Sequence, residues 1–282
     1  MPLLTHDLRI GDRAVTLIEG PAGWGEYSPL AGYPCDPSAC RRAAEEAAEI
    51  GFPRALREVV PVNALVDGPV FDADALRSFD AVKVKVRSER DIDVVARVRD
   101  AVGRATAVRV DANGAWDVDT AVAMIDRLAV YDLELVEQPV ATIDDLARVR
   151  RRVAIPVAAD ECIRSIDDAR RLRALDAADA IVVKQQPLGG VRAAMAIAEA
   201  AGVPTIVSSM METSVGLAAG LALAAALPEL PHACGLATLA YVGGDVASDP
   251  LLPEDGVLRV RAVVPDPELI ARYRVRNHEV TA

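Results

Sequence analysis

The segment AVKVKV (residues 81–86) is a Val-rich run that carries Lys83 and Lys85 two positions apart. Later apolar runs also end on a charged residue, at Asp111, Glu137, Asp160 and Lys184. Such runs at similar intervals indicate a repeated strand–helix unit. A parallel (β/α) barrel keeps its active site at the ends of its strands, where these charges lie.

Eight apolar runs are strand candidates, and several are rich in Val, Ile and Ala without alternation, as in strands covered by helices. They span 59–66, 81–86, 107–112, 133–138, 155–160, 180–185, 204–209 and 232–237. Helical stretches separate them, at 72–79, 89–102, 117–131, 143–152, 166–175, 191–201 and 213–226. This alternation predicts an α/β fold with a (β/α)8-type barrel, a modified TIM barrel. The competing architecture, an open doubly wound sheet, lacks a Gly-x-Gly-x-x-Gly after its first strand.

The first part of the chain departs from this repeat and predicts a small α+β capping domain. LRIGDRAVTLIEG (8–20) indicates a hairpin that turns at Gly-Asp. Residues 36–52 indicate a helix with Asp36 as its N-cap. Between them, GWGEYSPLAGYP (23–34) is typical of an irregular loop, in which Trp24 and Tyr27 either close over a substrate or pack the cap on the barrel.

These patterns divide the chain into two parts. We place the reduced capping domain at residues 1–57 and the catalytic barrel at 58–249. The tail, 250–282, contains a turn and a short strand that we expect to pack on the cap.

Composition limits the partners and the compartment. The net charge of −11 and pI of about 4.8 argue against nucleic acid as a partner. The most apolar segment, 215–227, is too short to span a bilayer, and the start of the chain resembles no signal peptide. Four cysteines without paired metal spacing fit a reducing cytoplasm. We expect a small-molecule carboxylate substrate and leave the oligomeric state open, a monomer included.

The charged strand ends form one predicted constellation. Side chains alternate along a strand, so Lys83 and Lys85 share a face, as do Arg109 and Asp111. The carboxylates of Asp111, Glu137 and Asp160 come from three consecutive strands. Neighbouring strands lie about 4.8 Å apart, so these carboxylates could meet around one ion. Oxygen-only ligation favours Mg²⁺ or Mn²⁺.

The alternative is a set of solvated side chains at strand ends. A lysine inside a Val-rich strand argues against it, because a buried charge needs a partner. A divalent ion beside lysines suits removal of a proton next to a carboxylate, since the ion stabilises the developing charge. A lysine near other cations can then act as a base near neutral pH.

With these residues placed, the chain resembles the enolase superfamily, in the branch with a Lys-x-Lys pair on the second barrel strand. The matching motifs are KVK (83–85), RVDANGAW (109–116), VEQP (136–139), ADE (159–161), VK (183–184), GWGEYSP (23–29) and SSMME (208–212). They follow the family's order and cover most of the chain.

The resemblance implies roles for these residues. Asp111, Glu137 and Asp160 would bind Mg²⁺, with Glu161 as the rival to Asp160. Lys85 would be the acid/base. Lys83 would lower the pKa of Lys85 and contact the substrate carboxylate, and Lys184 would face the substrate from the other side. Asn113 and Glu161 would orient the metal ligands. The candidates for substrate binding are Arg109, Ser208, Ser209 and Met211.

Within the superfamily, the chain resembles the o-succinylbenzoate synthase family of the shorter actinobacterial type. That family dehydrates 2-succinyl-6-hydroxy-2,4-cyclohexadiene-1-carboxylate to 2-succinylbenzoate in menaquinone biosynthesis. An N-acyl amino acid racemase or a dipeptide epimerase is the first alternative, although residues 232–240 lack the Asp-x-Asp typical of dipeptide epimerases. A non-catalytic, metal-binding barrel is the second.

Overall fold

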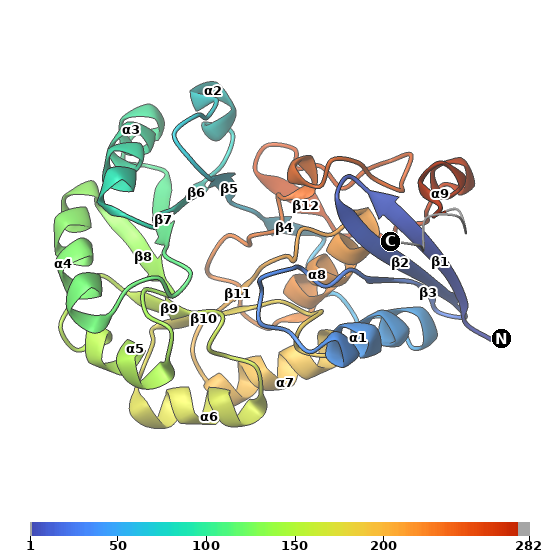
Figure 1. Cartoon of the computed structure of the whole chain (residues 1–282), viewed down its shortest axis with the longest axis horizontal. Helices are drawn as coiled ribbons and strands as arrows, with labels where there is room; N and C mark the ends of the chain where they lie inside the picture. The colour runs from blue at the N-terminus through green and yellow to red at the C-terminus, as the bar shows by residue number, and fades with distance from the viewer. Residues whose placement is uncertain (1, 276–282) are drawn as a thin grey trace, which may run out of the picture.

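Figure 1 shows a computed structural model of the chain, which describes residues 2–275. A seven-stranded parallel sheet curls into most of a barrel, and helices cover its outer face. The sheet contains β5 (Ala64–Val66), β6 (Ala81–Lys85), β7 (Ala107–Asp111), β8 (Leu133–Glu137), β9 (Val157–Ala159), β10 (Ala180–Val183) and β11 (Thr205–Val207), hydrogen-bonded in chain order. The predicted barrel is thereby confirmed.

The helices that alternate with these strands begin and end close to the predicted bounds. They are α2 (Ala73–Leu76), α3 (Ile92–Val102), α4 (Val118–Leu128), α5 (Ile143–Arg150), α6 (Ile166–Leu175), α7 (Val191–Ala201) and α8 (Ser214–Ala226), with 3₁₀ turns η1 (Glu89–Asp91), η2 (Ala129–Tyr131) and η3 (Leu239–Tyr241). Asp117, Thr142 and Ser165 each cap a helix by accepting a backbone N–H of its first turn. Such caps fix where each helix begins.

The eighth barrel strand, predicted at 232–237, is reduced to two single bridges in the described chain. Cys234 pairs with Val62, and Gly235 pairs with Ser208. Backbone hydrogen bonds of 2.8–3.1 Å on both sides of this segment close the barrel between β11 and β5. A Cβ on Gly235 would lie 2.6 Å from the Ser208 hydroxyl, so Ser208 would have to shift to admit any side chain there.

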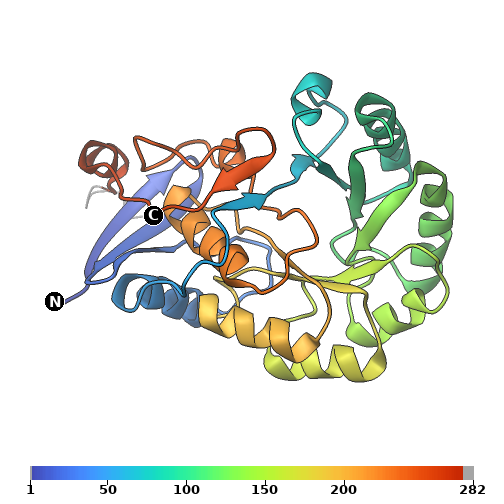
Figure 2. The ribbon, with the colours of Figure 1, turned by 180° about the vertical axis from the view of Figure 1, so that it is seen from behind.

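The predicted strand at 59–66 is divided in two. Its first half is β4 (Val59–Pro61), which pairs antiparallel with β12 (Val257–Arg259). Its second half is β5, at the edge of the parallel sheet. The partner changes at Pro61 and Val62: the Pro61 carbonyl accepts the Cys234 N–H at 2.8 Å, while Val62 donates to the Gly256 carbonyl at 2.8 Å. Figure 2 shows β12 beside β4 on the far side of the molecule.

The N-terminal region forms an antiparallel sheet of β1 (Leu4–Ile10), β2 (Arg13–Gly20) and β3 (Gly23–Tyr27), with α1 (Pro37–Glu49) against it. The hairpin and the helix agree with the sequence. The irregular loop predicted for 23–34 is wrong in its first part, because 23–27 is a strand. Gly25 permits this contact, since a Cβ there would lie 1.9 Å from the Ala44 carbonyl oxygen of α1.

The C-terminal tail also contacts the N-terminal sheet. Beyond β12, helix α9 (Pro267–Tyr273) lies against β1, and Leu8 forms a bridge with Arg274. Residues 276–282 of the predicted tail lie outside the described residues. The boundary between cap and barrel at residue 57 stays a prediction.

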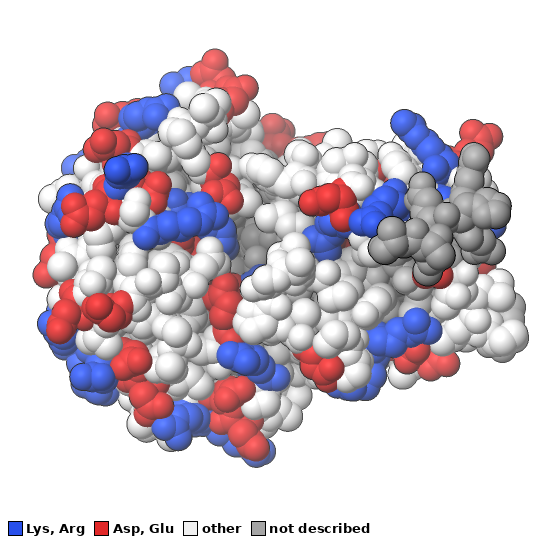
Figure 3. All heavy atoms as spheres, in the orientation of Figure 1, with Lys and Arg blue, Asp and Glu red and all other residues white. Residues whose placement is uncertain are grey.

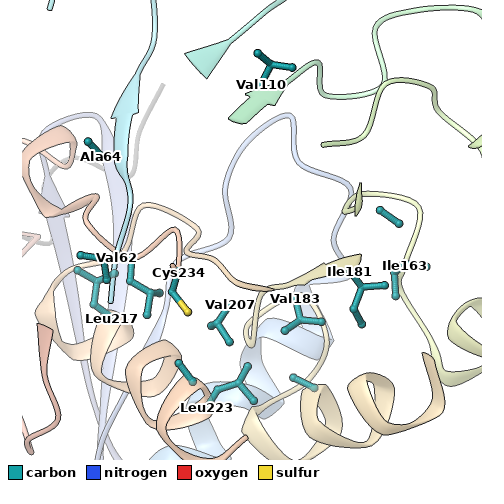
Figure 4. Packing of buried hydrophobic residues seen from close by; sticks show 14 of the residues in the cluster. Val62, Ala64, Val110, Ile163, Ile181, Val183, Val207, Leu217, Leu223 and Cys234 are labelled. Carbon is teal, nitrogen blue, oxygen red and sulfur yellow. The ribbon is translucent and has the colours of Figure 1, made fainter. Parts of the chain in front are cut away.

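Alternation along the strands divides the core into two parts. Residues such as Val110, Val183 and Val207 point outward to the helices, and Figure 4 shows them with Leu217 and Leu223 of α8. A smaller cluster fills the barrel interior, made of Leu135, Ala158, Ala180, Val182 and Ile206. Among residues 2–275, no helix has the length and apolar character that a membrane span requires.

Candidate active site

The charged residues singled out in the sequence lie above the interior cluster, at the carboxyl ends of the strands. Parallel pairing sets Lys85 opposite Asp111 and Asp111 opposite Glu137. Asp160 and Lys184 directly follow β9 and β10. The sheet therefore brings the predicted side chains to one end of the barrel, as a parallel barrel does with its active site.

Lys83 lies between two carboxylates. Its Nζ is 3.0 and 3.1 Å from the two carboxylate oxygens of Glu137 and 3.1 Å from Asp111 Oδ2. Burial opposes the charge on Lys83, but these carboxylates outweigh burial and raise its pKa. Burial and the charge of Asp111 raise the pKa of Glu137 in turn. Lys83 alone therefore does not compensate the negative charge of Asp111 and Glu137.

Lys85 joins the metal-ligand candidates to the residues that we expected to orient them. Its Nζ donates to Asp111 Oδ2 at 2.7 Å and to Asn113 Oδ1 at 2.8 Å. The Asn113 amide donates to Glu161 Oε1 at 2.8 Å. Burial opposes ionisation of Asp111, but Lys83 and Lys85 outweigh burial and hold the pKa of Asp111 below its usual range.

Lys184 faces this group from the other side of the barrel. Its ammonium donates to both carboxylate oxygens of Asp160. Burial opposes the charge on Lys184, but the carboxylates of Asp160 and Glu137 outweigh it and raise the pKa. Tyr33, from the loop after β3, donates its hydroxyl to Asp160 Oδ1 at 2.9 Å, and its ring centroid is 4.5 Å from Lys184 Nζ.

A cavity of about 630 Å³ opens above these side chains. The predicted residues that line it are Lys83, Lys85, Asp111, Asn113, Asp160, Glu161, Lys184, Ser208, Ser209 and Met211. Glu137 lies behind Lys83, which bonds to it. The cap contributes one wall through residues 30–34. The site is therefore built from both parts of the chain.

The three candidate metal ligands fit a hard divalent cation by chemistry and burial. Asp111, Glu137 and Asp160 are each at most 2% exposed and offer only oxygen atoms. Within the described residues, however, no three acidic, His or Cys side chains converge closely enough to hold an ion as they stand. Lys83 lies between Asp111 and Glu137, and Lys184 bonds both oxygens of Asp160. A bound ion would require these ammonium groups to move aside.

Glu161, the rival third ligand, differs from Asp160 in its contacts. Its Oε1 accepts from Asn113, while its buried Oε2 has no hydrogen-bond partner in the described structure. Burial and the charge of Asp160 raise the pKa of Glu161. The choice between Asp160 and Glu161 stays a prediction in favour of Asp160.

The prediction that Arg109 binds substrate is wrong. Arg109 shares the interior face with Asp111, as expected, but it is one layer deeper and 1% exposed. Its guanidinium bonds Glu134 and donates to the Ala233 carbonyl at 2.7 Å. A register shift in the pairing of β7 with β8, next to Arg109, leaves Glu134 unpaired in the ladder and available for this contact.

The other substrate-binding candidates line the cavity but already have partners. Ser209 Oγ is 2.7 Å from Thr238 Oγ1, and Ser208 Oγ is 3.4 Å from the Gly235 carbonyl oxygen. Met211 has a φ of 60°, which turns the chain at the cavity wall. Their contact with substrate stays a prediction.

Three residues of this site were not among the predicted ones. Tyr33 reaches the site, whereas Trp24 and Tyr27 pack within the cap: the Trp24 ring lies against His6 in a tilted arrangement, and Tyr27 contacts the cluster beneath α1. The side chain of Gln138 accepts the Asp160 N–H at 2.6 Å and so fixes the backbone at that carboxylate. Arg164 lines the cavity rim.

A buried polar network joins the cap to the barrel beside the cavity. Glu26 of β3 accepts N–H groups of Thr213 and Gly216 at the start of α8. Gln186, just after β10, donates to Glu212 at 3.1 Å and accepts the Ser28 N–H at 3.0 Å. Burial, followed by the charge of Glu26, raises the pKa of Glu212 to about 7. This network fixes the segments next to Lys184 and Met211.

Comparison with known proteins agrees with this geometry. Residues 71–266 match the family model described as enolase C-terminal domain-like, and residues 2–48 match the enolase N-terminal domain-like model. An o-succinylbenzoate synthase of Thermobifida fusca is 53% identical, covering 98% of this chain and 90% of the relative. That of Mycolicibacterium smegmatis is 43% identical, covering 96% and 87%.

The chain belongs to the enolase superfamily, in its o-succinylbenzoate synthase family. Members of the superfamily typically depend on a divalent metal. Among solved structures, muconate cycloisomerase from Pseudomonas fluorescens has a TM-score of 0.83 at 22% identity, covering 98% of both chains. The muconate lactonizing enzyme from Pseudomonas putida has a TM-score of 0.84 at 20% identity, covering 97% of this chain and 99% of that one. At these identities the likeness to the two solved structures shows the fold alone. The family models and the two relatives confirm the family resemblance expected from the sequence.

Proposed function

We propose that this site carries out the Mg²⁺-dependent syn-dehydration of 2-succinyl-6-hydroxy-2,4-cyclohexadiene-1-carboxylate to 2-succinylbenzoate. The observation that carries the proposal is the placement of Lys83, Lys85 and Lys184 around buried carboxylates in one cavity. The family membership supports the same activity. The racemase and epimerase alternatives and the non-catalytic barrel have no comparable support.

We assign the metal to Asp111, Glu137 and Asp160, with Mn²⁺ as a substitute for Mg²⁺. When bound, the ion stabilises the negative charge that develops on the substrate carboxylate. Asn113 and Glu161 border this group and hold its geometry through their mutual hydrogen bond. Gln138 holds the backbone of Asp160 in the same way.

Lys85 is the acid and base in this proposal. Its neutral amine takes the proton from the carbon that carries the carboxylate, and the electrons of the broken C–H bond form an enediolate. The electrons then move into the ring as the C–O bond to the hydroxyl breaks. Lys85 returns its proton to the departing oxygen, so water leaves and the ring becomes aromatic. One lysine serves both steps because both groups leave from the same face.

Lys83 and Lys184 supply positive charge. Lys83 lies next to Lys85 on the same face of β6, and when the ion is bound it turns from Asp111 and Glu137 to contact the substrate carboxylate. Lys184 faces the substrate from β10 and stabilises the enediolate as a cation, with the ring of Tyr33 beside its ammonium. Residues 30–34 of the cap close this side of the cavity against water.

We propose menaquinone biosynthesis as the pathway of this reaction and the cytoplasm as its compartment. Cys35, Cys40, Cys162 and Cys234 are free thiols, which suits a reducing environment. On the face in Figure 3, acidic and basic side chains intermingle without a continuous basic patch, which supports a small-molecule substrate over nucleic acid. We leave the oligomeric state open.

Direct assay of the purified protein for 2-succinylbenzoate formation tests the proposal. We expect turnover with Mg²⁺, loss of turnover with EDTA, and recovery when Mg²⁺ is restored in excess. N-succinyl amino acids assayed beside it report on racemisation. Full activity in metal-free protein would remove the metal role, and racemisation without dehydration would replace the proposed reaction with the first alternative.

A further inference from the structure

The substrate in the proposed function carries two carboxylates, and the residues discussed above account for one. The ring carboxylate is held between the metal site, Lys83 and Lys85. The second carboxylate ends the succinyl chain, three bonds beyond the ketone carbon. The cavity of about 630 Å³ has room for both the ring and the succinyl chain. A cation or strong hydrogen-bond donors at the rim would favour a carboxylate there over an apolar chain end.

Two arginines line the cavity, and one of them is already engaged. The guanidinium of Arg87 bonds both carboxylate oxygens of Asp67, at 2.7 and 3.1 Å. That bidentate pair uses both of its terminal nitrogens. Arg87 would have to give up Asp67 before it could bind a substrate carboxylate.

Arg164 has a different arrangement. It lies in the loop between Asp160 and Ser165, the N-cap of α6. Its Nε donates to the backbone carbonyl of Glu161 at 3.1 Å, which fixes the plane of the guanidinium. Among residues 2–275, neither of its Nη atoms has a hydrogen-bond or ion-pair partner. Arg164 therefore presents an unused two-pronged donor at the rim of the cavity.

We propose that Arg164 binds the terminal carboxylate of the succinyl chain and so selects acyl chains that end in a carboxylate. This inference rests on the proposed function. The bond from Nε to its own loop lowers the conformational entropy lost on binding, because the side chain is already held. Arg164 contacts a part of the substrate that does not react, so it contributes equally to binding of substrate and transition state.

The test compares two ligands that differ only at the chain end. The product 2-succinylbenzoate carries the terminal carboxylate, and 2-butanoylbenzoate ends in a methyl group. Binding of both is measured by calorimetry in the Mg²⁺-loaded wild type, in Arg164→Gln and in Arg164→Lys. Arg170→Gln is the matched control, because Arg170 lies on α6 outside this cavity and pairs with Asp167.

We expect the wild type and Arg170→Gln to prefer 2-succinylbenzoate by about tenfold, as a charge-assisted contact at a partly exposed site provides. Arg164→Gln should bind both ligands alike, and Arg164→Lys should fall between because it keeps the charge but loses the fork. In steady state, Arg164→Gln should raise KM about tenfold with kcat nearly unchanged.

An unchanged preference in Arg164→Gln, or an equal loss of affinity for both ligands, would overturn the assignment while dehydration by the wild type still stood. A wild type that neither forms nor binds 2-succinylbenzoate would overturn the proposed function and this inference together.

Discussion

The barrel interior holds two charged clusters on neighbouring strands, and their surroundings differ. At the mouth, Lys83 and Lys85 bond Asp111 and border a cavity. In the deep cluster, Arg109 is buried between Glu134 and the Ala233 carbonyl. Lys83 pairs with Arg109 in the register of β6 and β7, so neither the face nor the position along the strand separates the clusters. They differ in where the long side chains end: Lys83 reaches the carboxylates at the mouth, whereas Arg109 reaches Glu134, three residues before Glu137.

The two clusters also differ in how their charges are compensated. The mouth holds several carboxylates and lysines in mutual contact, and the pKa of Glu137 is raised because burial and Asp111 disfavour its charge. In the deep cluster, the single guanidinium bonds one carboxylate and one carbonyl, and His232 lies 2.7 Å from the other oxygen of Glu134. The lysines and carboxylates at the mouth can exchange partners when an ion or a substrate binds. The deep cluster instead joins β7 and β8 to residues 232–237, the segment that closes the barrel.

The largest expected effect is at the mouth. Lys85→Ala removes the group that transfers the proton, so kcat for dehydration should fall by roughly 10²- to 10⁴-fold. Stability should change little, because Asp111 keeps its contact with Lys83. Steady-state assay together with thermal unfolding checks both parts. Turnover near that of the wild type would reject Lys85 as the acid and base.

The reverse pattern is expected for the deep cluster. Arg109→Met should lower the free energy of unfolding by roughly 2–4 kcal/mol, because it leaves Glu134 and the Ala233 carbonyl without their partner. Urea unfolding monitored by circular dichroism measures this loss. The kcat per folded molecule should stay within about twofold of the wild type. A large loss of kcat with normal stability would restore the original assignment of Arg109 to the substrate.

A moderate effect should appear when Mg²⁺ binds at different pH values. The raised pKa of Glu137 means that a proton competes with the ion for this carboxylate, so Mg²⁺ affinity should strengthen as the pH rises from about 6.5 to 8.5. Calorimetry in buffers of different ionisation enthalpy should show protons released on binding. Glu134→Gln, which changes only the deep cluster, should keep this pH dependence. Affinity that does not vary with pH would contradict the assignment.

The smallest effect concerns the deep cluster in acid. Burial opposes the charge on Glu134, but hydrogen bonds with His232 and Arg109 outweigh burial and lower its pKa from 4.5 to about 2. Its contribution to stability is therefore complete above pH 4.5 and lost as the pH falls toward 2. The free energy of unfolding of Glu134→Gln should fall less than that of the wild type between pH 5 and pH 2.5. Parallel curves for the two proteins would show that the pair contributes nothing.

The sequence was sufficient to predict the barrel and the residues at its mouth. Charges at the ends of Val-rich runs mark both the strands and the end of the barrel that they reach, which placed Lys85, Asp111 and Lys184 in one cavity. The prediction for Arg109 was wrong because alternation along a strand specifies which face a side chain is on. It does not specify where the end of a long side chain lies. Its partner Glu134 depends on a register shift that no pattern in the sequence indicates.

The cap was harder to predict, because a glycine can indicate either a loop or a close contact between two elements. Gly23 and Gly25 suggested a loop, yet Gly25 permits close contact between β3 and α1. The aromatic residue that reaches the cavity is Tyr33, from the irregular stretch after that strand. A Gly-Tyr-Pro sequence just before a capped helix is a weak signal. Which aromatic side chain reaches the barrel depends on how the cap sits on it, and that is a tertiary contact.

The carboxylate of Glu26 has a consequence for how such a molecule can be modified. A strand of the N-terminal sheet supplies the acceptor for the first turn of α8, so a helix in one module is completed by a residue in the other. Thr213 would still accept the Val215 N–H, but a capping domain from a different protein would leave the Gly216 N–H without its acceptor unless it brought a carboxylate to the same point. Chimeras that exchange the two modules must therefore transplant this pair together.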